Sequence, residues 1–236
     1  MRVVLVATRN PLNLGASARA MSNFGFTHLR VVNPYEIAFR EARSAVGAAE
    51  LLASAEEYRS VADAVADCSL VVGTTAVRNR ELQHPMRRLQ DATILIRRSM
   101  RSSRVAILFG SEKTGLSNDS LSYCHWLIRI PTREEHPSMN LGQAVAVCLY
   151  EVARSSAGSN VRKKSKAAKA GDLERFTEEL LDAMRISGYL KPGTGATADA
   201  KVRRLVRRLA LQDEDAEVWL GMLKQILWKM RTPERR

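Results

Sequence analysis

Short apolar runs recur through the first two thirds of the chain, and each is followed closely by glycine, proline or asparagine. The runs are Val3–Ala7, Leu29–Val32, Leu70–Val72, Arg104–Phe109 and Trp126–Ile130. Strands that are buried on both faces of a sheet have this near-continuous apolar composition, without the alternation of a half-exposed strand. We therefore predict five strands over these ranges.

Between the runs lie stretches in which apolar or small residues recur every three or four positions. These stretches predict helices over Asn13–Phe24, Ala45–Ala55, Val61–Ala66 and Leu141–Ala153. Candidate N-caps are Asn13 for the first helix, Ser60 for the third, and either Ser138 or Asn140 for the fourth. Strands that alternate with helices predict an α/β fold with a mostly parallel sheet.

The pattern changes at residues 155–171, where small residues and lysines replace the apolar positions. We predict a flexible basic linker over residues 156–171, which joins an α/β domain of residues 1–155 to a small helical module of residues 172–236. The helices predicted in this module are Leu173–Ile186, Val202–Leu211 and Ala216–Met230.

Helical spacing assigns faces to the last two of these helices. Arg204, Arg207 and Arg208 are predicted to share one face, opposite Val202, Leu205, Val206 and Leu209. On the last helix, one face is predicted to carry Trp219, Leu223, Ile226 and Met230.

Composition excludes several classes of protein. The chain has 236 residues, of which 45% are hydrophobic and 26% are charged, as in globular and not in disordered proteins. No apolar run approaches the roughly 20 residues of a membrane span. The cysteines, Cys68, Cys124 and Cys148, are three and widely spaced, so we expect no disulfide framework, no zinc site and no other metal site. We expect a soluble protein of the cytoplasm, with no membrane partner.

The net charge of +12 points to a polyanionic partner. Residues 155–236 carry more of this excess than residues 1–154, although they are only about a third of the chain. Nucleic acid is the commonest polyanion that such a surface binds, and a merely soluble basic protein is the alternative.

Three segments that follow predicted strands have unusual residues for plain turns. They are NPLNLGASAR at 10–19, FGSEKTGLS at 109–117, and a segment from Ile130 to Ala144 that contains HPSMNLGQA. In an open α/β sheet, ligands bind beyond the carboxyl ends of the strands. Neither a dinucleotide fingerprint nor a complete P-loop is present, because GSEKTG lacks the lysine that would follow its last glycine.

Taken in order, the patterns NPxNxGxxAR, LFGxExxGL and IP…SMNLGxA resemble the SPOUT class of RNA 2′-O-ribose methyltransferases. The basic helical extension makes the chain most similar to the TrmJ branch, which methylates nucleotide 32 in the anticodon loop of tRNA. The resemblance covers residues 1–155 and extends over residues 172–230. It implies S-adenosylmethionine as cofactor, tRNA as substrate, and a homodimer with the active site at its interface. It also implies a C-terminal trefoil knot in the α/β domain, which pattern reasoning alone would exclude.

The resemblance also implies roles for individual residues. Arg19 corresponds to the catalytic arginine, with Asn13 beside it, and Glu112 and Ser138 are further catalytic candidates. The residues implied as cofactor contacts are Thr74, Thr75, Ala76, Gly110, Ile130, Ser138, Met139, Asn140 and Leu141. The residues expected to contact tRNA phosphates are Lys163, Lys164, Lys166, Arg204, Arg207 and Arg208, with a solvated linker and helix face as the alternative.

Two roles for Arg19 remain open at this point. An arginine is a poor general base, and it serves as one only if burial or cofactor charge depresses its pKa strongly. Alternatively, Arg19 binds the flanking phosphate and polarises the 2′-hydroxyl, while Ser138 or a water relays the proton. Two other functions are also open, namely methylation of another RNA such as ribosomal RNA, and RNA binding without catalysis.

Overall fold

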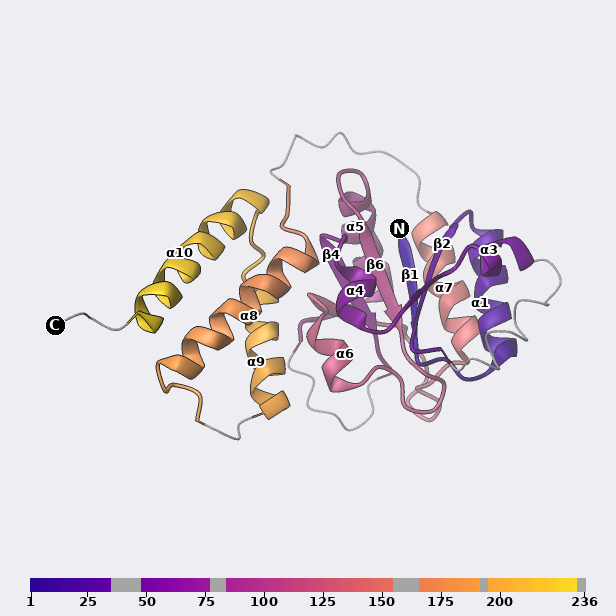
Figure 1. The fold of residues 1–236 in the computed structure, drawn as a ribbon. Coiled ribbons are helices and arrows are strands. Elements are labelled where there is room, and N and C mark those ends of the chain that lie inside the picture. The colour runs from indigo at the N-terminus through magenta and orange to yellow at the C-terminus, as the bar shows by residue number, and fades with distance from the viewer. Residues whose placement is uncertain (35–47, 77–83, 155–165, 192–194, 233–236) are drawn as a thin grey trace.

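The computed structural model describes residues 1–34, 48–76, 84–154, 166–191 and 195–232. A parallel sheet of seven strands runs through the α/β domain in the order β3-β2-β1-β6-β4-β7-β5. Figure 1 labels four neighbouring strands of this sheet, β2, β1, β6 and β4. The strands are β1 (Arg2–Val6), β2 (His28–Val32), β3 (Glu56–Tyr58), β4 (Leu70–Thr74), β5 (Met86–Arg88), β6 (Val105–Phe109) and β7 (Trp126–Arg129). The five predicted strands are confirmed, with ends that differ by one or two residues. The two strands that were not predicted, β3 and β5, are short and mostly exposed.

Helices cover both faces of the sheet. On one face, α1 (Pro11–Asn23), α3 (Ala49–Ala53), α5 (Leu89–Met100) and α7 (Leu141–Arg154) pack on a core that includes Val3 and Leu5. On the other face, α4 (Val61–Val65) and α6 (Asn118–Ser122) pack on a core that includes Val4 and Val6. Successive residues of β1 therefore enter two different cores, which explains its unbroken apolar sequence.

Side chains of asparagine and serine fix where three helices begin. The predicted cap Ser60 is confirmed, because its Oγ accepts a hydrogen bond from Asp63 N at 3.1 Å. The prediction of Asn13 as a cap is wrong. The first helix is capped by Asn10, whose Oδ1 accepts from Leu12 N at 2.9 Å, and Pro11 starts the helix. Of the two candidates before α7, Asn140 takes the role, with Oδ1 3.4 Å from Gln143 N.

Strand β7 lies between β4 and β5, which follow one another in the chain. The connection between β4 and β5 includes residues 77–83, which lie outside the described residues. The trefoil knot implied by the resemblance therefore stays a prediction. In the described parts of the chain, no helix is both long and apolar enough to cross a membrane.

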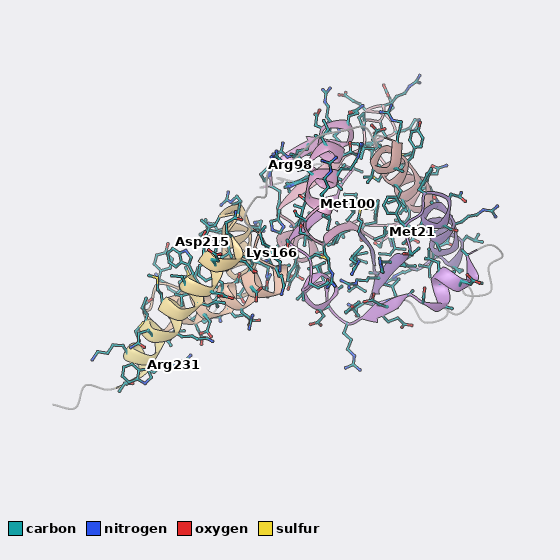
Figure 2. The ribbon with its side chains drawn as sticks, turned by 90° about the horizontal axis from the view of Figure 1, so that it is seen from above. Met21, Arg98, Met100, Lys166, Asp215 and Arg231 are labelled. Carbon is teal, nitrogen blue, oxygen red and sulfur yellow. The ribbon has the colours of Figure 1, made fainter. Side chains whose placement is uncertain are left out.

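The helical module consists of α8 (Ala170–Ile186), α9 (Gly195–Arg208) and α10 (Asp213–Arg231) (Figure 1). Figure 2 shows α10 on the side of the module away from the sheet, with Asp215 toward one end and Arg231 at the other. Helix α8 begins within the predicted linker. Its first residues are held by the α/β domain, because Ala170 N donates to Cys68 O at 2.7 Å and Gly171 N donates to Ala66 O at 2.9 Å.

Residues 166–169 are likewise part of the module. Ala168 N donates to Leu211 O at 3.0 Å, and Asp213 N donates to Lys166 O at 2.8 Å. The prediction of a flexible linker is therefore wrong for these four residues, because their backbone is paired with the turn between α9 and α10. The earlier part of the predicted linker, residues 155–165, lies outside the described residues, and with it Lys163 and Lys164.

The prediction that Arg207 shares an exposed face with Arg204 and Arg208 is wrong. Arg207 is 2% exposed, its Nη2 lies 3.0 Å from a carboxylate oxygen of Glu174, and its Nη1 donates to Ala170 O at 3.0 Å. Burial lowers the pKa of Arg207 to about 10, although the charge of Glu174 acts in the opposite direction. Helical spacing alone does not reveal that a carboxylate on the neighbouring helix draws this arginine inward.

The same helix carries a second inward arginine, Arg203. Its Nε lies 2.9 Å from Glu174, its Nη1 donates to Ser122 Oγ at 3.0 Å, and its guanidinium lies 4.3 Å from the centre of the Tyr123 ring. Arg203 therefore joins α8 and α9 to the segment around α6. The buried face of α9 is therefore not the predicted apolar face. Leu205 and Leu209, which were predicted on that apolar face, are about half exposed.

The last helix, α10, packs through a different face from the predicted one. Its buried residues are Ala216, Leu223 and Leu227. Of the predicted face, only Leu223 is buried. Trp219 is partly exposed and stacks on Phe176, with the ring centres 5.7 Å apart.

Candidate active site

A cavity of about 390 Å³ opens at the carboxyl edge of the sheet, where β4, β6 and β7 end. Its walls are the segments that follow these three strands, together with the start of α7. The volume lies within the roughly 300–1,000 Å³ of small-molecule sites, and the position is where open α/β sheets bind ligands. Two of the three predicted segments, 109–117 and Ile130–Ala144, thus line one cavity, because parallel strands bring their carboxyl ends to the same edge.

The turn after β6 closes on itself at a glycine. Ser111 and Gly115 form an isolated bridge, in which Gly115 N donates to Ser111 O at 2.8 Å. A Cβ atom on Gly110 would lie 2.0 Å from the backbone carbon of Gly115 and 2.1 Å from Leu116 N. Only glycine fits at position 110, since the clash would be with backbone and not with a movable side chain.

Glu112 ties this turn to the segment that follows β1. Its Oε1 accepts from Asn10 N at 3.2 Å and from Asn13 Nδ2 at 3.1 Å, and its Oε2 accepts from Arg9 N at 3.3 Å. Burial raises the pKa of Glu112, but hydrogen bonds from its own backbone, from Asn13 and from the two amides outweigh this effect, so the pKa is lowered.

The contact continues to the third segment through two asparagines. Asn140 Nδ2 donates to Asn13 Oδ1 at 2.7 Å, while Asn140 Oδ1 accepts the α7 capping bond from Gln143 N. Glu112, Asn13 and Asn140 therefore form a directed chain of hydrogen bonds, in which the carboxylate fixes the orientation of one amide and that amide fixes the next. All three sequence motifs are joined in this way. We call these three residues the Asn13–Glu112–Asn140 chain.

Most of the predicted cofactor contacts line the cavity. These are Thr74, Thr75, Ala76, Gly110, Ile130, Ser138, Met139 and Leu141. Asn140 is not in the lining and acts in the chain described above. The hydroxyl of Thr74 is turned to the sheet, where it donates to Leu108 O at 2.9 Å.

The four catalytic candidates divide into three groups. Glu112 and Ser138 line the cavity, and Asn13 is buried and supports Glu112. Arg19 lies on α1, is exposed, and is not in the cavity lining. Among the ion pairs that the described residues form, none involves Arg19.

Several lining residues received no role from the sequence. Leu116, Leu121, Thr132, Pro137 and Ala144 are in the lining. Leu121 comes from α6, a helix of five residues whose short polar sequence carries no helical period. The other four lie within the two segments that contain the second and third motifs, and this position is the signal in the sequence that could have found them.

A second hollow borders the first across the turn after β6. Its lining includes Arg9, Asn10, Pro11 and Lys113, and it shares Glu112 with the first cavity. Arg9 and Lys113 bring two cations to the edge of the site.

Replacing Glu112 by glutamine is expected to lower kcat/KM by roughly 10- to 100-fold, because an amide offers one acceptor where the carboxylate serves three donors. The carboxylate must be ionised to accept these bonds. Since the pKa of Glu112 is lowered, its carboxylate should keep these hydrogen bonds as the pH falls below the usual pKa range of glutamate. The hydrogen bonds should be lost as the pH falls through the lowered pKa.

Kinetics of the methyl transfer that the sequence resemblance implies, measured from neutral pH downward through the lowered pKa of Glu112, check this expectation. Glu134→Gln is the matched control, since Glu134 is exposed on the segment before α7. Equal kinetics for the two variants would contradict a positioning role for Glu112.

The chain was compared with known proteins. Residues 1–150 match the model of the SpoU rRNA Methylase family. Over its full length the chain is 34% identical to the tRNA (cytidine/uridine-2′-O-)-methyltransferase TrmJ of Yersinia pestis (strain Pestoides F), of which it covers 94%.

Solved structures give the same picture. The crystal structure of TrmJ from Z. mobilis ZM4 is similar with a TM-score of 0.84 and 30% identity, over 95% of this chain and 98% of that one. The SpoU methyltransferase AviRb of Streptomyces viridochromogenes, solved in complex with AdoMet, matches 65% of this chain and 57% of its own with a TM-score of 0.50. At 24% identity, this second likeness shows the fold alone.

Proposed function

The chain belongs to the SpoU rRNA methylase family, and from this membership we propose that it methylates the 2′-oxygen of a ribose in tRNA, with S-adenosylmethionine as the methyl donor. The observation that carries the proposal is that two of the motifs line one cavity and that the remaining motif is joined to them through the Asn13–Glu112–Asn140 chain. The full-length likeness to TrmJ, which includes the helical module, supports tRNA as the substrate.

Nucleotide 32 of the anticodon loop is the proposed target, by resemblance to the TrmJ branch. Methylation of another RNA, such as ribosomal RNA, is the second candidate, and the name of the matching family model favours keeping it. A tRNA substrate also implies that the chain acts in the cytoplasm.

The cavity fits the proposed cofactor. It combines apolar walls, among them Leu116, Leu121 and Met139, with hydroxyl and main-chain groups at positions 75, 110 and 138. An adenosyl group needs apolar contact on its faces and hydrogen bonds at its edges, and the lining offers both. The close passage of Gly110 against Gly115 leaves main-chain groups, and no side chain, at this part of the wall.

When bound, S-adenosylmethionine would supply an electrophilic methyl group on a sulfonium sulfur. The protein must then hold a ribose hydroxyl in line with that group and accept its proton. Orientation alone can supply several kcal/mol of the barrier. Ser138 lines the cavity and is the proposed proton relay, directly or through a water. Glu112 and Asn13 act as positioning residues, since their hydrogen bonds are used within the site.

Arg19 is the proposed catalytic arginine, in the role of binding the phosphate beside the target and polarising the hydroxyl. This role is favoured over that of a general base, because an arginine keeps its proton at the pH of the reaction unless its surroundings strongly favour the neutral form. Because Arg19 does not line the cavity of its own chain, we propose that the active site is completed at the interface of a homodimer.

Exposed apolar side chains on one face of the sheet support a homodimer. Leu12, Ile94 and Tyr150 are 79%, 68% and 50% exposed, and they lie on α1, α5 and α7, which cover the same face of the sheet. Burial of such side chains between two copies is a usual source of dimer stability. Light scattering on the purified chain measures the mass directly.

The function is tested by methyl transfer from labelled S-adenosylmethionine to an unmodified tRNA transcript, followed by nuclease mapping. Label on the ribose of nucleotide 32 is the expected result. Label on ribosomal RNA alone would replace the proposal by the second candidate. Cofactor binding without transfer to any RNA would refute catalysis by the chain alone and indicate an RNA-binding protein.

A further inference from the structure

Two arginines stand side by side at the carboxyl edge of the sheet. Arg88 of β5 and Arg129 of β7 are direct neighbours in the parallel register. The residue after Arg129 is Ile130, which lines the cavity. Like charges directly opposite each other on neighbouring strands destabilise a sheet, so this pair has a cost that the fold alone does not explain.

These two arginines belong to the same face of the sheet as the helical module. Neighbouring residues in register project to one face, and the pair Met86–Leu127, two positions earlier, projects to the same face as Arg88 and Arg129. Leu127 is part of the core under α4 and α6, and the start of α8 also enters that core. Helix α9 contacts α6 on this face.

Two more arginines approach from α9. Arg204 and Arg208 are one helical turn apart. The pKa of His84 is lowered, mainly by burial and in addition by the charges of Arg204 and Arg208. His84 lies two residues before the start of β5. The basic surface therefore runs from α9, past His84, along β5 and to the end of β7 beside the cavity.

The other two arginines of α9 differ from this surface, because a carboxylate neutralises them. Arg203 and Arg207 are both paired with Glu174. Among the ion pairs of the described residues, in contrast, none involves Arg88, Arg129 or Arg208. Within the described part of the chain, Arg88, Arg129 and Arg208 thus present positive charge that no ion-paired carboxylate neutralises.

We propose that Arg88, Arg129, Arg204 and Arg208 form a phosphate-binding surface that holds the backbone of the substrate RNA next to the cavity. This inference rests on the proposed function and locates its substrate. Repeated phosphates match a row of spaced guanidinium groups, each of which binds a phosphate through paired N–H donors. The surface positions the RNA and reads no bases. Because it includes residues of both the α/β domain and α9, bound RNA bridges the two.

The test uses the full chain and an unmodified tRNA transcript, in the absence of cofactor. Two double variants, Arg88→Gln with Arg129→Gln and Arg204→Gln with Arg208→Gln, each remove two charges from the surface. The matched control is Arg59→Gln with Arg98→Gln. It removes the same charge from exposed positions that are not on the surface: Arg59 follows β3 at the far end of the sheet, and Arg98 lies near the end of α5 (Figure 2).

Each surface variant is expected to raise the Kd for tRNA by about tenfold and to make the plot of log Kd against log salt less steep by about 0.7–0.9 for each lost contact. The control is expected to keep the wild-type salt slope. Binding of S-adenosylmethionine, measured by calorimetry, should be the same in all variants, which excludes a general loss of folding.

Equal weakening of tRNA binding by the control and the surface variants would overturn the inference, because total charge and not this surface would then govern binding. Unchanged binding in both surface variants would overturn it as well. The proposed function is measured separately, by methyl transfer. A wild-type chain that methylates tRNA while both surface variants bind normally refutes the surface alone. A chain that binds tRNA through the surface and transfers no methyl group refutes the proposed function alone.

Discussion

Replacing Arg19 by lysine is expected to lower kcat/KM for tRNA methylation by about 100- to 1,000-fold, while the affinity for S-adenosylmethionine stays the same. The loss of one well-placed donor to a developing negative charge has an effect of this size, and lysine does not reproduce the planar fork of a guanidinium. Cofactor affinity should not change, because Arg19 does not line the cavity. Single-turnover kinetics and calorimetry on the same preparation give the two quantities.

The variant should keep the stability of the wild type, since Arg19 is exposed and surface substitutions have small effects on stability. Wild-type activity in the lysine variant would remove both of its proposed roles, as base and as phosphate ligand. A fall in cofactor affinity that accounts for the whole effect would instead assign Arg19 to cofactor binding.

A mixing experiment examines the interface. Subunits that carry Arg19→Ala lack the arginine, and subunits that carry Gly110→Ala lack an intact cavity. If the arginine of one subunit serves the cavity of the other, dimers of the two inactive variants recover part of the activity. If each chain uses its own arginine, no activity returns, and the proposal of a shared active site is withdrawn.

The substitution Gly110→Ala is expected to abolish measurable binding of S-adenosylmethionine, with a loss of at least about 100-fold in affinity, and to lower the free energy of unfolding by about 1–3 kcal/mol. The added Cβ would lie 2.0 Å from the backbone of Gly115, so the turn after β6 has to open. This turn carries Glu112, and its displacement also breaks the Asn13–Glu112–Asn140 chain. Calorimetry measures the binding, and urea unfolding measures the stability.

Gly221→Ala is the control, because a Cβ there meets no atom within 4 Å and the residue lies inside α10. Its expected effect has the opposite sign, a gain of about 0.5–1 kcal/mol from the better helix propensity of alanine. A Gly110→Ala protein that binds the cofactor normally would show that the turn tolerates a side chain, and the account of the cavity wall would be wrong.

The helical module shows where sequence reasoning stops. Arg203, Arg204, Arg207 and Arg208 lie on one helix with a clear period, and the sequence assigned Arg207 to an exposed face that contacts tRNA phosphates. The carboxylate of Glu174, 33 residues away along the chain from Arg207, reverses that assignment. Periodicity describes which residues share a face, but it holds no information on which face another helix will cover.

Five of the seven strands, the principal helices and the three unusual segments that follow strands were predicted from the sequence alone, because local apolar periodicity and turn residues act over a few positions. The sequence also indicated the family, because three motifs in a fixed order are specific to it. Only the tertiary structure decided what distant groups do together. It joined Asn13, Glu112 and Asn140 into one hydrogen-bonded chain, buried Arg207, and set Arg88 beside Arg129 at the edge of the cavity. These outcomes depend on strand order and register, through which residues far apart in the chain become neighbours.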